Sequence, residues 1–186
     1  MKRIMLIFTI IFVVSCLSQK TVKKDNKCKV LETENEIAFD SLFKNIDTTD
    51  LFKNKIKDFE IHRTGVLLCQ FLPNMKYGKY TLVKKVDDKF FCYNSNSSHN
   101  NEVDLKNPDI QLISNNINSI RKKYYYEECD EYISNDAFYL MFVKKDGEII
   151  AKYFSHGNIS LKKTDENVNL NMLKSVLEVM YRNSFR

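Results

Sequence analysis

Residues 138–154 constrain the fold more than any other part of the chain. The first half, FYLMFV at 138–143, is apolar on both faces and has the length of a strand, so we expect it at the centre of a sheet. Asp146-Gly147 follows, and an Asp-Gly pair is the strongest short signal for a hairpin turn. Residues 149–154 then return antiparallel. A chain with this hairpin must build a β-sheet.

Three further strands are expected between residues 66 and 93. They cover 66–72, 80–83 and 90–93, and they are separated by the turn signals Pro73-Asn74 and Asp87-Asp88. Residues 94–104 (NSNSSHNNEVD) are polar throughout and indicate a loop.

Helical spacing of apolar residues appears before, between and after these strands. Thr33 with Glu36 matches a capping box, and Asn107-Pro108 has the cap and first-turn residues of a second helix start. The apolar stripes that follow the helical period are Phe39, Leu42, Phe43 and Ile46; Phe52, Ile56 and Phe59; Ile110, Ile113, Ile117 and Ile120, continued by Tyr124; and Leu170, Leu173, Val176 or Leu177, and Met180.

This order of elements predicts an α+β fold. We expect an antiparallel sheet of about five strands, with N-terminal, middle and C-terminal helices packed on it. The chain has 186 residues, of which 44% are hydrophobic, so it suits one domain, which we place at residues 33–186. The same composition excludes a disordered chain, and four glycines argue against a glycine-rich nucleotide site.

The N-terminus has the pattern of an export signal. Lys2 and Arg3 precede an apolar run of eleven residues at 4–14, interrupted only by Thr9. A membrane-spanning helix needs about 20 apolar residues, so this run is too short to be a good span. We therefore expect residues 1–15 to be a signal peptide.

Val13-Val14-Ser15-Cys16 resembles the lipobox of bacterial lipoproteins, possessing an aliphatic residue, a small residue and then cysteine directly after the apolar run. The resemblance implies cleavage after Ser15 and a diacylglyceryl anchor on Cys16, with a fatty acyl group such as palmitate on the new amino group. In lipoproteins of enteric bacteria an aspartate after the cysteine favours inner-membrane retention, so by resemblance Leu17 permits sorting to the outer membrane. The abundance of Lys, Asn and Ile fits a Bacteroidetes-like lipoprotein, in which acidic residues just after the cysteine are associated with surface display. Residues 19–24 are basic, so we expect the protein to face the periplasm. The resemblance covers sixteen residues and does not extend to the folded domain.

Residues 16–32 are polar and rich in lysine, which indicates a lipidated flexible tether. A solvated spacer is the simpler interpretation. Attraction of its lysines to anionic lipid headgroups, at about 1 kcal/mol per basic residue, is the alternative.

Four cysteines remain after Cys16, namely Cys28, Cys69, Cys92 and Cys129. In an oxidising compartment they allow three pairings, and we take Cys69, Cys92 and Cys129 as the disulfide candidates. Buried free thiols are the competing interpretation.

Catalytic and metal-binding motifs are missing from the sequence. It has no CxxC, HExxH, GxSxG or P-loop pattern, so we expect no catalytic residues, no cofactor and no metal. His62 and Cys69 are the nearest approach to a Cys-His pair, but Cys69 lies in an apolar strand that disfavours a thiolate. The acidic cluster Glu127, Glu128, Asp130 and Glu131 is expected to be a solvated turn.

Tyr124-Tyr125-Tyr126 is the one candidate interaction surface in the sequence. On a helix these three side chains cannot share a face, so we expect at least one in the core and at least one exposed.

A lipid-anchored envelope protein with a noncatalytic binding domain fits these features best. Its partner would be a protein or a small ligand, and an immunity-type protein is one specific form. A periplasmic enzyme such as a cell-wall hydrolase, or a structural subunit of an outer-membrane assembly, remains an alternative. Loss of Lys2 and Arg3 with the signal reduces a net charge that is only +5, so we do not expect nucleic acid as a partner.

Overall fold

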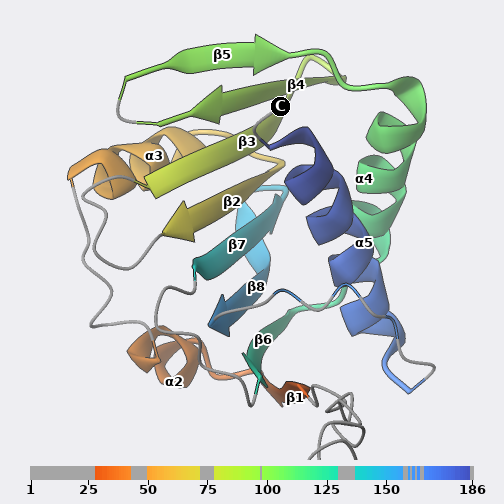
Figure 1. Ribbon diagram of the computed structural model, residues 1–186. Coiled ribbons are helices and arrows are strands. Elements are labelled where there is room, and N and C mark those ends of the chain that lie inside the picture. Colours follow the sequence, from red (N-terminus) through yellow and green to blue (C-terminus); the bar gives the residue numbers. More distant parts are fainter. Residues whose placement is uncertain are drawn as a thin grey trace, which may run out of the picture.

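The computed structural model describes residues 28–42, 50–71, 78–96, 98–129, 137–156, 159, 161, 163 and 166–184. These residues form an α+β fold in three layers (Figure 1). An eight-stranded sheet, in the order β1-β6-β8-β7-β2-β3-β4-β5, lies between two helices on each face. Helices α4 and α5 cover one face, and α2 and α3 cover the other.

The elements have the following bounds. The strands are β1 (Cys28–Thr33), β2 (Gly65–Phe71), β3 (Gly78–Val86), β4 (Lys89–Ser95), β5 (Asn100–Val103), β6 (Lys123–Cys129), β7 (Phe138–Lys145) and β8 (Glu148–His156). The helices are α2 (Glu36–Ser41), α3 (Asp50–Glu60), α4 (Asn107–Ser119) and α5 (Val168–Asn183).

The expected α+β class is confirmed, but five strands is an undercount and the sheet is mixed. Strands β6 and β8 pair in parallel, whereas every other neighbouring pair is antiparallel. Two of the missed strands, β1 and β5, are the edges of the sheet and are mostly exposed. Edge strands carry polar side chains, and such sequences resemble a tether or a loop.

Residues 28–32 therefore belong to the folded domain, although we expected them in the tether. They form most of β1, which pairs with β6 from Cys28 opposite Cys129 to Thr33 opposite Tyr124. Residues 1–27, including the expected signal peptide, Ser15 and Cys16, lie outside the described residues. The chain thus enters the domain at one edge of the sheet.

The hairpin of residues 138–154 forms as expected. Strands β7 and β8 pair antiparallel around Asp146 (φ 53°) and Gly147 (φ 94°). A φ of this sign is easy for glycine and tolerable for aspartate, which is why Asp-Gly favours this turn. Strand β7 lies between β8 and β2, inside the sheet.

Successive side chains of the central strands point to opposite faces of the sheet, and both faces are covered by helices. This explains why these strands are apolar on both faces. In β2, Val66 and Leu68 face the core under α4 and α5, whereas Leu67 and Cys69 face the core under α2 and α3. Gly65 begins this strand because a Cβ there would lie 2.5 Å from the carbonyl oxygen of Val83. The sheet therefore separates two hydrophobic cores.

The helices at the middle and the C-terminus follow the expected stripes. Ile113 and Ile117 of α4 are buried, and so are the stripe residues of α5, namely Leu170, Leu173, Val176, Leu177 and Met180. The capping-box expectation is wrong. Thr33 ends β1, and Asn35 caps α2 by accepting a hydrogen bond from the backbone N–H of Ala38 at 3.1 Å.

Buried lysines of the β7–β8 hairpin fix α2 and α3 to the sheet. Lys152 is 5% exposed and pairs with Glu36 and Asp40 of α2 at 2.7 Å each. Lys144 donates to the carbonyl oxygen of Glu60 at the end of α3, at 2.5 Å. A buried ammonium needs such partners, so the hairpin determines where both short helices dock.

Candidate binding site

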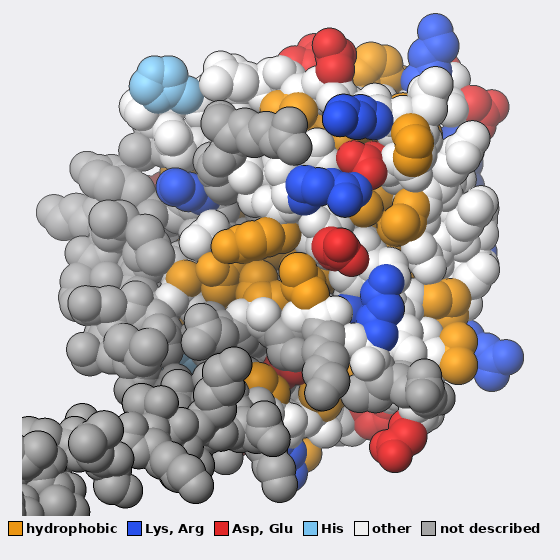
Figure 2. Space-filling view, turned by 45° about the vertical axis from the view of Figure 1, so that its right-hand side comes forward, with side chains coloured by type: hydrophobic (Ala, Val, Ile, Leu, Met, Phe, Trp, Pro, Cys, Tyr) orange, Lys and Arg blue, Asp and Glu red, His pale blue; other side chains and the backbone are white. Residues whose placement is uncertain are grey.

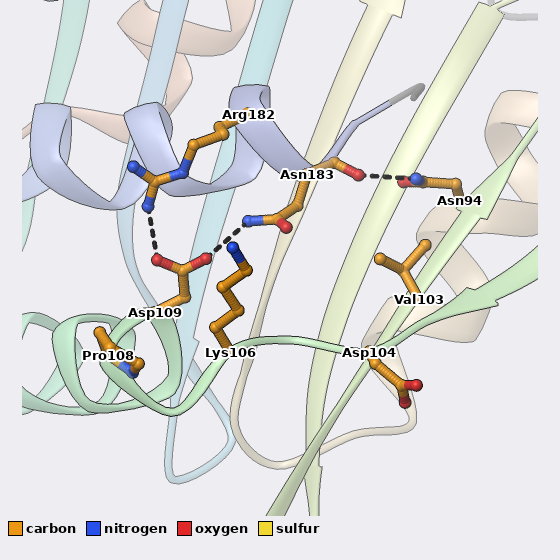
Figure 3. Close-up of a pocket in the computed structure, with 8 residues that line it drawn as sticks. All are labelled: Asn94, Val103, Asp104, Lys106, Pro108, Asp109, Arg182 and Asn183. Atoms are coloured by element: carbon orange, nitrogen blue, oxygen red, sulfur yellow. Dashed lines mark hydrogen bonds and ion pairs between the residues drawn. The ribbon is translucent and has the colours of Figure 1, made fainter.

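A pocket of about 400 Å³ opens where the ends of two helices meet the edge of the sheet. Its walls are the first turn of α4, the last turn of α5, and the β4–β5 pair with the segment that follows it (Figure 3). Charged and amide side chains make up most of its lining.

Asp109 is the centre of this pocket. Its side chain is 11% exposed and accepts hydrogen bonds from Arg182 at 2.5 Å and from the Asn183 amide at 3.1 Å. The Asn183 carbonyl in turn accepts a hydrogen bond from Asn94 at 2.7 Å, and Asn94 accepts one from Thr81 at 2.8 Å. One hydrogen-bonded series thus joins β3, β4, α5 and α4.

Local sequence places each of these groups. Helix α4 begins at Asn107, one residue earlier than expected, with Lys106 at the cap position and Pro108 in the first turn. Asp109 therefore lies in the first turn, where an acidic side chain is favoured by the helix dipole. Arg182 lies in the last turn of α5, where a cation is favoured for the same reason.

Lys106 supplies a positive charge that the pocket does not neutralise. Figure 3 shows its ammonium group directed toward Asn183 and Asp109, while the side chain of Asp104, which also lines the pocket, is directed away from these three groups. Among the described residues, Lys106 has no ion-pair or hydrogen-bonding partner for its side chain. Because Asp109 is already paired with Arg182, Lys106 is the lining cation that has no ion-pair partner among the described residues, and Asp104 is the corresponding anion.

The cysteine expectation is partly wrong. Cys69 and Cys92 are free, buried thiols, so neither takes part in a bridge. Each lies on a core face of its strand, where burial raises the pKa of Cys69 and raises the pKa of Cys92 to about 12. Cys28, which we did not favour, is disulfide-bonded, and in the β1–β6 register it lies opposite the third candidate, Cys129.

The tyrosine expectation is wrong for two of its three residues. Residues 124–126 lie on strand β6 and not on a helix, so Tyr124 and Tyr125 point to opposite cores and are 0% and 1% exposed. Tyr124 donates a hydrogen bond to Glu36 at 3.3 Å, and Tyr125 accepts one from Asn169 at 2.8 Å. Tyr126 is half-buried and stacks on Phe154. Tyr124 and Tyr125 are therefore structural.

The acidic cluster is not uniformly solvated. Glu127 is 1% exposed, pairs with Lys174 at 2.9 Å and accepts a hydrogen bond from Tyr153. Burial and the neighbouring carboxylate raise the pKa of Tyr153, so this hydroxyl stays protonated and donates. Asp130 and Glu131 lie outside the described residues.

His62 and Cys69 do not form a catalytic pair. His62 precedes β2, and Cys69 is four residues beyond the start of that strand, about 13 Å along it at the usual rise. Burial lowers the pKa of His62, whose nearest carboxylate is Asp58 at 3.6 Å. Within the described residues, no three His, Cys, Asp or Glu side chains lie close enough to hold a metal ion.

The described residues include no helix that is long and apolar enough to span a membrane. On the coloured part of the face shown in Figure 2, basic and acidic side chains are interspersed. Comparison with known proteins gives no match among family models, curated proteins or solved structures.

The pocket residues were missed by sequence reasoning. The start of α4 and the last turns of α5 are visible in the sequence, as Asn107-Pro108 and the stripe that ends at Met180 show. What no local pattern reveals is that the start of one helix lies against the end of the other. The ion pair between Asp109 and Arg182 spans 73 positions.

Proposed function

We propose that this protein is a lipid-anchored cell-envelope protein whose domain binds a partner protein or a small ligand without catalysing a reaction. Its anchor is the lipidated Cys16, and its location is the periplasmic face of the outer membrane. An immunity-type protein is the most specific version of the proposal. The basis for the anchor is the sequence alone: a basic start, a short apolar run and the lipobox-like Val13-Val14-Ser15-Cys16.

The observation that carries the binding role is the place of the pocket in the sheet. The N-terminal segment joins the domain at β1, whereas the pocket adjoins β4 and β5 at the other edge. Seven strand spacings separate β1 from β5, which amounts to about 33 Å. A domain tethered by its N-terminal segment can present this edge to partners away from the membrane.

Three further points support the proposal. Cys28 is disulfide-bonded, and structural disulfides persist in oxidising compartments such as the periplasm. Two or more acyl chains suffice for stable anchoring, because each buried methylene contributes about 0.8 kcal/mol. The unpaired ammonium group of Lys106 gives the pocket a group with which to orient a ligand.

The anchor is tested by metabolic labelling with an alkyne fatty acid. We expect labelling and membrane fractionation of the wild-type protein, and loss of both for Cys16→Ala. Labelling of the Cys16→Ala variant would contradict the assigned anchor. Peptide mapping without reduction tests the compartment, and we expect a bridge between Cys28 and Cys129.

The binding role is tested by mild crosslinking in native membranes, followed by purification and mass spectrometry. We expect one partner at fixed stoichiometry with the wild-type protein and its loss with Asp109→Ala, which opens the pocket wall. Lys89→Glu is the matched control, because Lys89 is exposed at the far end of β4. Recovery of the protein without any partner or ligand would contradict the proposal.

A further inference from the structure

The outer side of β5 is an open sheet edge that runs directly into the pocket. Strand β5 is last in the order of the sheet, and Asn100, Asn101 and Glu102 are exposed. Its final residue, Val103, and the next residue, Asp104, both line the pocket. Edge and pocket are therefore parts of one continuous surface.

The pattern of hydrogen bonds between β4 and β5 identifies which backbone N–H and C=O groups of β5 point outward from the sheet. The N–H of Asn96 donates to the carbonyl of His99 at 3.0 Å, which makes residues 96 and 99 a directly bonded pair. Bonded pairs alternate along an antiparallel ladder, so residues 101 and 103 face β4. Residues 100 and 102 consequently direct their N–H and C=O groups outward.

Strand β1 forms the other edge of the sheet, and this edge is engaged by other parts of the chain. Strand β1 is tied to the rest of the chain by the Cys28 disulfide, and Glu32 is engaged by Lys123 at 3.2 Å and by Asn167 at 2.8 Å. It is also the edge at which the tether enters the domain.

The positive charge of Lys106 favours a ligand that carries a negative charge. Asp109 is satisfied by Arg182 and Asn183, and the Asp104 side chain is directed away from them, so Lys106 supplies the cation without an ion-pair partner at the end of the pocket formed by Asp109 and Asn183. A carboxylate complements this charge, whereas a second cation does not. An extended peptide is the ligand that uses both the outward backbone groups of β5 and this ammonium group.

We propose that β5 and the pocket form one site for an extended peptide segment of a partner protein, which pairs with β5 as a ninth strand and places a carboxylate against Lys106. This inference rests on the proposed function and names its partner chemistry. A C-terminal carboxylate reaches the pocket only when the peptide runs parallel to β5. An Asp or Glu side chain reaches it in either direction.

The test uses the full chain in detergent and two random decapeptide libraries, one with free C-terminal carboxyl groups and one with amidated C-termini. We expect selected peptides to lose at least tenfold in affinity with Lys106→Glu and to keep their affinity with Lys89→Glu. Binding restricted to the free-carboxyl library assigns the C-terminus, and equal binding of amidated acidic peptides assigns a side chain. Peptides that bind wild type and Lys106→Glu equally would overturn the proposal.

The pairing of the peptide with β5 can be measured separately from its affinity. We expect bound peptide to slow amide hydrogen exchange at residues 100 and 102, and Glu102→Pro to weaken binding because it removes an outward N–H. This N–H faces away from β4, so a proline there is compatible with an edge strand, and a thermal melt verifies that the variant is folded. Binding without protection of these amides would overturn strand addition.

The two proposals can fail separately. If a stoichiometric envelope partner is captured but no peptide from either library binds, the peptide inference fails and the binding role stands. If the protein is recovered alone from membranes and no peptide binds, both fail.

Discussion

Helix α5 carries two cations that reach acidic partners, and their surroundings differ sharply. Lys174 and Glu127 are 3% and 1% exposed and lie beneath the helix, whereas Arg182 and Asp109 are 48% and 11% exposed and line the pocket. The first pair has no access to water if one partner is lost. The second can exchange a partner for solvent or ligand. Burial, and not charge, separates a structural pair from one suited to a binding site.

The largest effect is expected from breaking the buried pair. Glu127→Leu removes the buried carboxylate that pairs with Lys174 and accepts a hydrogen bond from the Tyr153 hydroxyl, which should lower the free energy of unfolding by about 3–5 kcal/mol. Urea denaturation measures this. The variant Glu127→Leu/Lys174→Met/Tyr153→Phe should recover most of the loss. A loss below about 1 kcal/mol in the single variant would contradict the assigned role.

A smaller effect is expected at the pocket. Asp109→Ala removes the acceptor for Arg182 and Asn183, but Arg182 is half exposed and can be solvated. We expect a loss of about 1–2 kcal/mol by urea denaturation. A loss as large as that of Glu127→Leu would remove the distinction between the two pairs.

The contact between Lys152 and Glu36 is an intermediate case, and it should make the free energy of unfolding depend on pH. The hydrogen bond from Lys152 lowers the pKa of Glu36 below 4.5, so this contact stabilises the fold above that pH and is lost as pH falls through the lowered pKa. Glu36 is 46% exposed, so solvent screening limits the effect at pH 7 to about 1 kcal/mol. Unfolding curves from pH 7 to 3 should show a shallower acid loss for Lys152→Met than for wild type. Identical slopes would contradict this role of Lys152.

The smallest effect is expected at the surface. Lys122 and Glu148 are 2.5 Å apart but 50% and 62% exposed. Lys122→Ala should change the free energy of unfolding less than any of the variants above, and the change should shrink further in high salt. A salt-independent loss as large as that of Asp109→Ala, measured by the same urea titration, would show that exposure does not govern this series.

Local patterns in the sequence predicted the elements that bury a periodic face. The β7–β8 hairpin, β2, α4 and α5 belong to this group, because Asp146-Gly147 and the stripes of Ile and Leu are signals within one element. Strands β1, β5 and β6 were missed for a different reason. The place of β1 and β6 in the sheet depends on partners far along the chain, such as Tyr126 opposite Leu31, whereas the polar residues of β5 resemble a loop.

The same limit applies to the site. The sequence predicted a helix start at Asn107-Pro108 and a helical stripe that ends at Met180, but the pairing of Asp109 with Arg182 is a property of how α4 packs on α5. Tyr124 and Tyr125 were misplaced because the isoleucine spacing was extended past Ile120, where the helix has already ended. The lipobox-like segment needs no tertiary partner, so the sequence alone can suggest it.

The position of β8 has a consequence for when the chain can fold. Strand β8 lies between β6 and β7, which both precede it, so β1 and β6 have no hydrogen-bonded connection to the other five strands until β8 is in place. The sheet is therefore completed only by residues near the end of the chain. A polypeptide that crosses a membrane from its N-terminus could complete this sheet only after β8 had crossed. Its folding would therefore be completed on the far side of the membrane.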